Sequence, residues 1–184
     1  MAWVVFLRAV NVGGANRCQP ALIAKELAKF EIVNIGAVGT LVVCKDVSES
    51  TLRAAIARKL PFKCEIMICP ARDIIKLVRQ WTDSPWRASK DPFSRQPSGP
   101  NITRFVSVLA KRLPALPPLP LSLPSDNDWL VKIIAIQDRF VFGLYRRQMK
   151  AISYLGKIEK RLGAPVTTRN WNTIEKVVKI LRNE

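Results

Sequence analysis

Apolar residues in the first 82 positions recur in patterns that predict alternating strands and helices. A continuous apolar run over residues 2–10 is typical of a strand that is covered on both faces. Helical spacing follows over residues 20–30, beginning at Pro20, which favours the first turn of a helix. Residues 31–35 and 40–44 then predict two strands joined by a glycine-containing turn.

The next segment predicts a second helix followed by another strand. Ser48 is a favourable N-cap residue, and Glu49 carries a negative charge suited to the first turn of a helix. A strand over residues 63–69 and a third helix over 71–81 follow. The order strand, helix, strand, strand, helix, strand is that of a split βαβ arrangement, so we expect residues 1–82 to form a ferredoxin-like lobe.

Composition changes between residues 83 and 100, where serine, proline, glycine and basic residues predict an inter-lobe connection. Beyond it, we expect strands at 102–109, 129–136 and 140–145, and helices at 152–162 and from residue 170 onward. Five prolines over residues 111–124 exclude a helix there. The sequence therefore predicts an α+β fold, in which the ferredoxin-like lobe is followed by a second, smaller α/β lobe over 101–184.

Length and composition are those of a soluble globular protein. The chain has 184 residues, of which 48% are hydrophobic. Its apolar runs are far shorter than the roughly 18 residues that a membrane-spanning helix needs, so we expect no membrane partner. The apolar run at the N-terminus is too short for a signal peptide, which favours a cytoplasmic location.

Cysteine and histidine usage narrows the chemistry. The cysteines at positions 18, 44, 64 and 69 are scattered, and three of them lie in apolar runs, so we interpret them as structural thiols. The chain contains no histidine, which removes Ser-His and Cys-His nucleophile systems and the usual partners of a zinc site. We expect no metal and no cofactor, and the sequence contains no recognisable catalytic motif.

Charge points to a polyanion. The chain has 30 basic and 14 acidic residues, a formal charge of +16 that favours nucleic acid or another polyanion as a partner. The candidate nucleic-acid-binding residues are Arg146, Arg147, Lys150 and Lys157, continued by Lys160 and Arg161. Further basic residues and candidates for base stacking are Arg87, Lys90, Arg95, Arg104, Lys111, Arg112, Trp86, Phe93 and Tyr154. The alternative interpretation is solvated charge spread over several faces.

A first candidate ligand site lies between the first strand and the first helix. A glycine turn there lets backbone amides approach an anion close to a helix N-terminus. Neither a G-x-G-x-x-G nor a P-loop pattern is present, so neither a Rossmann nor a P-loop nucleotide site is supported. Alternatively, the glycines only provide positive φ and the asparagine bonds to the turn backbone. The residues of this site are Arg8, Asn11, Gly13, Gly14, Asn16 and Arg17.

A second candidate site lies near the C-terminus, at the predicted start of the last helix. Arg169, Asn170 and Asn172 could together hold a phosphate, a carboxylate or a base edge. The alternative is a helix cap in which Trp171 plugs the core and the asparagines serve the backbone. If the two lobes bring this segment to the first site, the two segments form one polar cleft.

Both segments carry a family resemblance. Phe6-Leu7-Arg8, Asn11-Val12-Gly13-Gly14 and Asn16 resemble the FLRGINVGG-x-N/K signature of domain of unknown function 1697, a family of uncharacterised bacterial proteins. The segment from Thr168 to Thr173 is similar to the T-x-R-N-W-N-T motif of that family. Ala9, Val10 and Ala37 depart from the family pattern. The resemblance spans most of the chain, but it implies no activity, because none is agreed for the family.

Three functions are compatible with these observations. The first is a non-catalytic protein that binds an anion or a nucleic acid, which the charge and the lack of an acid–base set favour. The second is an enzyme that acts on a small anionic substrate in a cleft between the lobes. The third is an adaptor whose basic surface meets an acidic protein.

Overall fold

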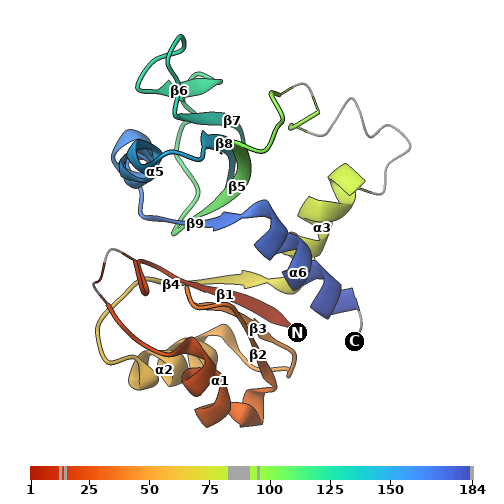
Figure 1. Cartoon of the computed structure of the whole chain (residues 1–184). Coiled ribbons are helices and arrows are strands. Elements are labelled where there is room, and N and C mark those ends of the chain that lie inside the picture. Colours follow the sequence, from red (N-terminus) through yellow and green to blue (C-terminus); the bar gives the residue numbers. More distant parts are fainter. Residues whose placement is uncertain (13, 15, 83–91, 95, 183–184) are drawn as a thin grey trace. The chain divides into compact units, whose positions relative to one another are not determined.

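The chain folds into two compact units of α+β structure. The structure is a computed structural model that describes residues 1–12, 14, 16–82, 92–94 and 96–182 (Figure 1). Unit 1 consists of Met1–Arg79 and Thr173–Glu184, and unit 2 of Gln80–Asn172. The α+β prediction is confirmed.

The limits of the units differ from the expected lobes. The chain passes between the units within helix α3 (Ala71–Thr82) and again within helix α6 (Trp171–Arg182), so the last helix groups with unit 1. The units contain 91 and 93 residues, and the second is therefore not the smaller. Most of the expected connection over 83–100 lies outside the described residues.

Unit 1 is a four-stranded antiparallel sheet with two helices on one face (Figure 1). The strand order is β2-β3-β1-β4. The elements are β1 (Trp3–Leu7), α1 (Pro20–Glu26), a 3-10 turn (Ala28–Phe30), β2 (Ile32–Ile35), β3 (Thr40–Val43), α2 (Glu49–Lys59) and β4 (Ile66–Pro70). Each of the two helices connects strands that have a third strand between them, which is the split βαβ arrangement.

The core of unit 1 follows from the apolar pattern of its first strand. All five residues of β1 are buried, as the continuous run predicts. Val5 and Leu7 belong to a cluster that includes Ile23 of α1 and Leu52 of α2. Ser48 caps α2, because its side chain accepts a hydrogen bond from the Thr51 backbone N–H at 3.2 Å.

Unit 2 is a five-stranded antiparallel sheet with helix α5 on one face. The strand order is β6-β7-β8-β5-β9. The elements are β5 (Ile102–Leu109), β6 (Leu121–Leu123), β7 (Val131–Gln137), β8 (Phe140–Arg146), α5 (Met149–Leu162) and β9 (Val166–Asn170). Phe105, Val131 and Val141 share a core cluster with Ile158 of α5, which shows which face of the sheet this helix covers.

The two sheets repeat one strand order. In unit 2 the order β7-β8-β5-β9 matches β2-β3-β1-β4 of unit 1, and α5 occupies the place of α2 in the sequence. The counterpart of α1 is replaced by the proline-rich segment 111–124, as its proline content predicts. Leu113 and Leu121 pack from this segment onto the core cluster.

Candidate anion-binding site

Asn11 of the first candidate site is bonded to the backbone of its own unit. Its side-chain Nδ2 donates to the carbonyl oxygens of Cys18 at 2.8 Å and Ala37 at 2.6 Å. Its Oδ1 accepts a hydrogen bond from the Cys18 backbone N–H at 3.0 Å. The amide therefore closes the loop after β1 and ties it to the turn between β2 and β3, which is the structural role that the alternative interpretation assigns to it.

The other residues of the first site surround this closed loop. The backbone N–H of Arg8, a half-buried residue, donates to the Glu65 carbonyl oxygen at 3.0 Å. Asn16 has a φ of +49° and its carbonyl accepts the Asn11 N–H at 3.1 Å. Gly14, with a φ of +78°, and Arg17 are exposed. Gly13 lies outside the described residues.

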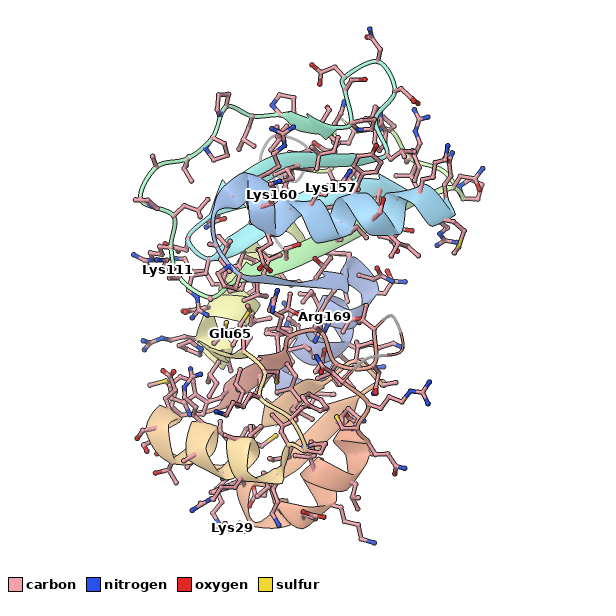
Figure 2. The ribbon with its side chains drawn as sticks, turned by 90° about the vertical axis from the view of Figure 1, so that its left-hand side faces the viewer. Lys29, Glu65, Lys111, Lys157, Lys160 and Arg169 are labelled. Atoms are coloured by element: carbon pink, nitrogen blue, oxygen red, sulfur yellow. The ribbon has the colours of Figure 1, made fainter. Side chains whose placement is uncertain are left out.

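Arg169 of the second site is buried within a strand rather than at a helix cap. It lies on β9 opposite Val106 of β5, with an exposed fraction of 5% (Figure 2). Its Nη1 donates to the Thr167 hydroxyl at 2.8 Å and to the Thr168 carbonyl at 2.9 Å. Burial lowers the pKa of the guanidinium from its usual value to about 10, so the group is still charged at neutral pH.

The neighbours of Arg169 divide between surface and core. Asn170 is exposed, and its Oδ1 accepts a hydrogen bond from the Tyr145 hydroxyl at 3.1 Å. Asn172 is also exposed, in the first turn of α6 and not before it. Trp171 is buried against Phe93, with the ring centroids 5.6 Å apart. Arg8 and Arg169 belong to different units, and the polar cleft between the two motifs stays a prediction.

The basic run after β8 is divided between the two faces of the unit 2 sheet. Side chains alternate along a strand, so Arg146 lies on the face opposite to that of Tyr145, which packs with α5. Arg146 stacks on Trp129, with its guanidinium carbon 4.7 Å from the ring centroid. Arg147 instead donates from Nε to the Thr103 hydroxyl at 2.9 Å. Two adjacent arginines therefore serve two different surfaces.

One side of helix α5 carries a row of cations. Lys150, Tyr154, Lys157 and Arg161, here called the α5 stripe, follow one another at intervals of four, three and four residues, which places them on one side of a helix. The three basic residues are exposed, and Lys157 Nζ lies 4.2 Å from the centroid of the half-buried Tyr154 ring. Figure 2 shows α5 in front of the strands of unit 2, with Lys157 and Lys160 labelled on it.

On helix α5 itself, no carboxylate lies on the same side as the α5 stripe. Glu159 is the one acidic residue of α5, and it lies on the opposite flank of the helix. Its Oε2 accepts a hydrogen bond from the Val166 backbone N–H at 3.3 Å. The stripe spans twelve residues, or about 16 Å along the axis. It can therefore contact several neighbouring phosphates of an extended polyanion.

Base stacking has fewer candidates than the sequence indicates. The prediction that Phe93 stacks on a base is wrong, because this residue has an exposed fraction of 3% and packs edge-on against Phe142 and Trp171. Trp86 lies outside the described residues, as do Arg87, Lys90 and Arg95. Tyr154 remains, next to Lys157. Its position in a cationic row was detectable from helical spacing alone.

The excess of positive charge is distributed over both units. Unit 2 has 15 basic and 6 acidic residues, and unit 1 has 15 basic and 8 acidic residues, giving +9 and +7. The total charge therefore does not by itself point to one surface. The arrangement of charges on α5 does.

Within the described part of the chain, no three His, Cys, Asp or Glu side chains are grouped in a way that could hold a metal ion. Burial raises the pKa of the Cys18 and Cys64 thiols, which lowers their thiolate fraction at neutral pH. No helix among the described residues is long and apolar enough to cross a membrane.

Comparison with known proteins adds information on the fold. No family model and no curated protein sequence matches the chain. Among solved structures, the chain is similar to the conserved bacterial protein SP0830 from Streptococcus pneumoniae, with a TM-score of 0.59 and 15% sequence identity over 98% of both chains. At this level of identity the likeness shows a shared α+β fold of two sheet-containing lobes.

Proposed function

We propose that this protein is a non-catalytic binder of nucleic acid or a similar polyanion, and that the α5 stripe is its principal contact surface. The observation that carries the proposal is the row of exposed cations on one side of α5, whose single carboxylate is bonded to the Val166 backbone. Arg147, an exposed residue that precedes this helix in the sequence, supplies a fourth cation. Such a row contacts phosphates without reading base identity.

The proposal makes a quantitative statement about salt. Each phosphate contact releases counterions, so the logarithm of the binding constant falls by about 0.9 per contact for duplex DNA and about 0.7 for a single strand, per logarithm of salt. Four contacts then predict a loss of about 150-fold for duplex and about 50-fold for single strands between 50 and 200 mM salt. Binding would be measured by fluorescence anisotropy with labelled RNA and DNA oligonucleotides. No binding at 50 mM salt, or binding without a salt dependence, would contradict the proposal.

Charge-reversal variants separate the stripe from the net charge. The triple variant Lys150→Glu/Lys157→Glu/Arg161→Glu removes the row on α5. The matched control is Lys25→Glu/Arg58→Glu/Lys63→Glu, which changes the net charge equally at three exposed positions of unit 1. We expect the first variant to lose at least tenfold in affinity, roughly the effect of one or two charge-assisted contacts, and the control to lose much less. Equal losses would show that the net charge, and not the stripe, drives binding.

We also infer that the protein belongs to the domain of unknown function 1697 family and acts in the cytoplasm. The motifs around Arg8 and Arg169 support the first inference. The first motif lies early in the sequence and the second late, in the order of the family pattern. Cys18 and Cys64 form no disulfide bond, which is compatible with a reducing compartment. Cell fractionation would test the location independently of any binding assay.

A further inference from the structure

The face of the unit 2 sheet opposite α5, here called the far face, carries a second group of cations. Arg104 of β5 and Lys132 of β7 both lie opposite Leu144 of β8, one on each side of it. Arg146 lies two residues beyond Leu144 on the same face. The strand register therefore gathers three basic residues, distant in sequence, around one buried leucine.

Two of these cations share one aromatic ring. Lys132 Nζ lies 5.3 Å and the Arg146 guanidinium carbon 4.7 Å from the centroid of Trp129. Their charged centres are consequently no more than 10 Å apart. The third cation, Arg104, lies with its guanidinium carbon 5.2 Å from the centroid of Phe93. All three are held by ring faces, which orient a cation without neutralising it.

The far-face cations have no acidic counterpart in the described part of the chain. None of the ion pairs found there includes Arg104, Lys132 or Arg146. Like charges this close repel one another, and an anion placed between them removes the repulsion and gains two charge-assisted hydrogen bonds. Arg104 is exposed and the other two are half-buried, so solvent reaches the group.

The spacing fits a phosphoryl group. Two charge-assisted hydrogen bonds of about 2.8 Å to two oxygens of one phosphoryl group join nitrogen atoms roughly 6–8 Å apart. That range lies within the 10 Å limit for Lys132 and Arg146. Arg104 is two strand spacings from Lys132, or roughly 10 Å between backbones, which its long side chain can shorten toward a second phosphoryl group.

We propose that the far face is a binding site for a diphosphate group, with one phosphoryl between Lys132 and Arg146 and the other toward Arg104. Trp129 is buried, with an exposed fraction of 6%, so it offers no surface for stacking a base. The site therefore recognises the diphosphate and not an attached nucleoside. It shares no residue with the α5 stripe and does not depend on polyanion binding there.

Isothermal titration of the full chain with phosphate, pyrophosphate and ADP at low salt tests this site. We expect pyrophosphate to bind at least tenfold more tightly than phosphate, and ADP to bind no more tightly than pyrophosphate. Absence of pyrophosphate binding would overturn the proposal. A clear preference for ADP would overturn the assignment to the diphosphate alone.

Variants locate the binding. Lys132→Gln/Arg146→Gln should lose at least tenfold in pyrophosphate affinity, while Arg104→Gln should abolish the preference of pyrophosphate over phosphate. The matched control Lys25→Gln/Arg58→Gln, at two exposed positions of unit 1, should bind pyrophosphate unchanged. If the double variant does not fold, the Arg104→Gln variant still tests the proposal, because its position is exposed. An unchanged preference in Arg104→Gln, or an equal loss in the unit 1 control, would overturn the proposal without affecting the test of the α5 stripe by oligonucleotides.

Discussion

Gly39 and Leu7 approach one another so closely that a side chain at position 39 has no space. The Leu7 backbone N–H donates to the Gly39 carbonyl oxygen at 2.8 Å. A Cβ atom added to Gly39 would lie 2.7 Å from the Leu7 Cβ. The turn between β2 and β3 is therefore pressed against the end of β1, at the point where the first candidate site begins.

Gly39→Ala should destabilise the protein by about 2–5 kcal/mol. The φ of +74° strains any residue with a Cβ by about 1–2 kcal/mol, and the clash with Leu7 adds an overpacking cost of about 1–3 kcal/mol. Urea unfolding followed by circular dichroism measures the change. Gly36→Ala is the matched control, because Gly36 has a φ of +72° in the same turn with nothing within 4 Å of its added Cβ. Equal losses in the two variants would show that the Leu7 contact is unimportant.

Asn11→Ala should also destabilise the fold, by roughly 2–4 kcal/mol, because it removes hydrogen bonds to two carbonyls and one backbone N–H. Asn11→Asp is the informative companion, since a carboxylate keeps the acceptor for the Cys18 N–H but loses both donations. In urea unfolding, we expect the stability of Asn11→Asp to lie between those of the parent and Asn11→Ala, or to equal that of Asn11→Ala. Unchanged stability in both variants would remove the structural role of Asn11 and favour a ligand-binding role.

The sequence predicts unit 1 well because its signals are local. The run from Trp3 to Leu7 is buried on both faces, and Ser48 caps α2, as the apolar pattern and the capping preference indicate. The grouping of α6 with unit 1 was not predictable, since its apolar stripe of Ile174, Val177 and Val178 specifies burial but not the surface that buries it.

The candidate site depends on strand register, which the sequence does not reveal. We expected Arg169 and Asn170 at the start of the last helix, but both belong to strand β9, in which the Thr168 hydroxyl bonds to the Ser107 hydroxyl at 2.6 Å. The separation of Arg146 from Arg147 and the meeting of Arg146 with Lys132 both follow from the pairing of β7 with β8. Only the α5 stripe can be recognised in the sequence itself, because its residues recur at helical spacing.

Gly143→Ala should prevent normal folding of unit 2. A Cβ on Gly143 of β8 would lie 2.5 Å from the Lys132 carbonyl oxygen and would penetrate the Phe105 ring, and neither the paired strand nor the buried ring can move without losing contacts. We expect little soluble protein, or a loss well above 3 kcal/mol in urea unfolding, since overpacking in a sheet adds to lost pairing.

The control for this prediction is Gly156→Ala in α5, where nothing lies within 4 Å of the added Cβ. It should stabilise the protein by up to about 1 kcal/mol, because alanine favours a helix interior over glycine. It lies between Tyr154 and Lys157 in sequence, so an oligonucleotide titration of the same variant also shows whether greater helix rigidity alters polyanion binding. A Gly143→Ala variant as stable as the parent would contradict the close packing of β8 against Phe105.

The buried Arg169 predicts an effect of alkaline pH on stability. Burial lowers its pKa to about 10 in the folded protein, so the unfolded chain binds the proton more tightly. The contribution of this group to stability therefore rises as the pH increases above 10, toward the higher pKa of the unfolded chain, and is lost as the pH falls through 10. The difference in unfolding free energy between the parent and Arg169→Met should be constant from pH 7 to 9 and should shift in favour of the parent above pH 10. Arg161→Met, at an exposed position of α5, gives the baseline for all other titrating groups. A shift in favour of Arg169→Met above pH 10 would show that the folded protein stabilises the charged guanidinium instead of disfavouring it.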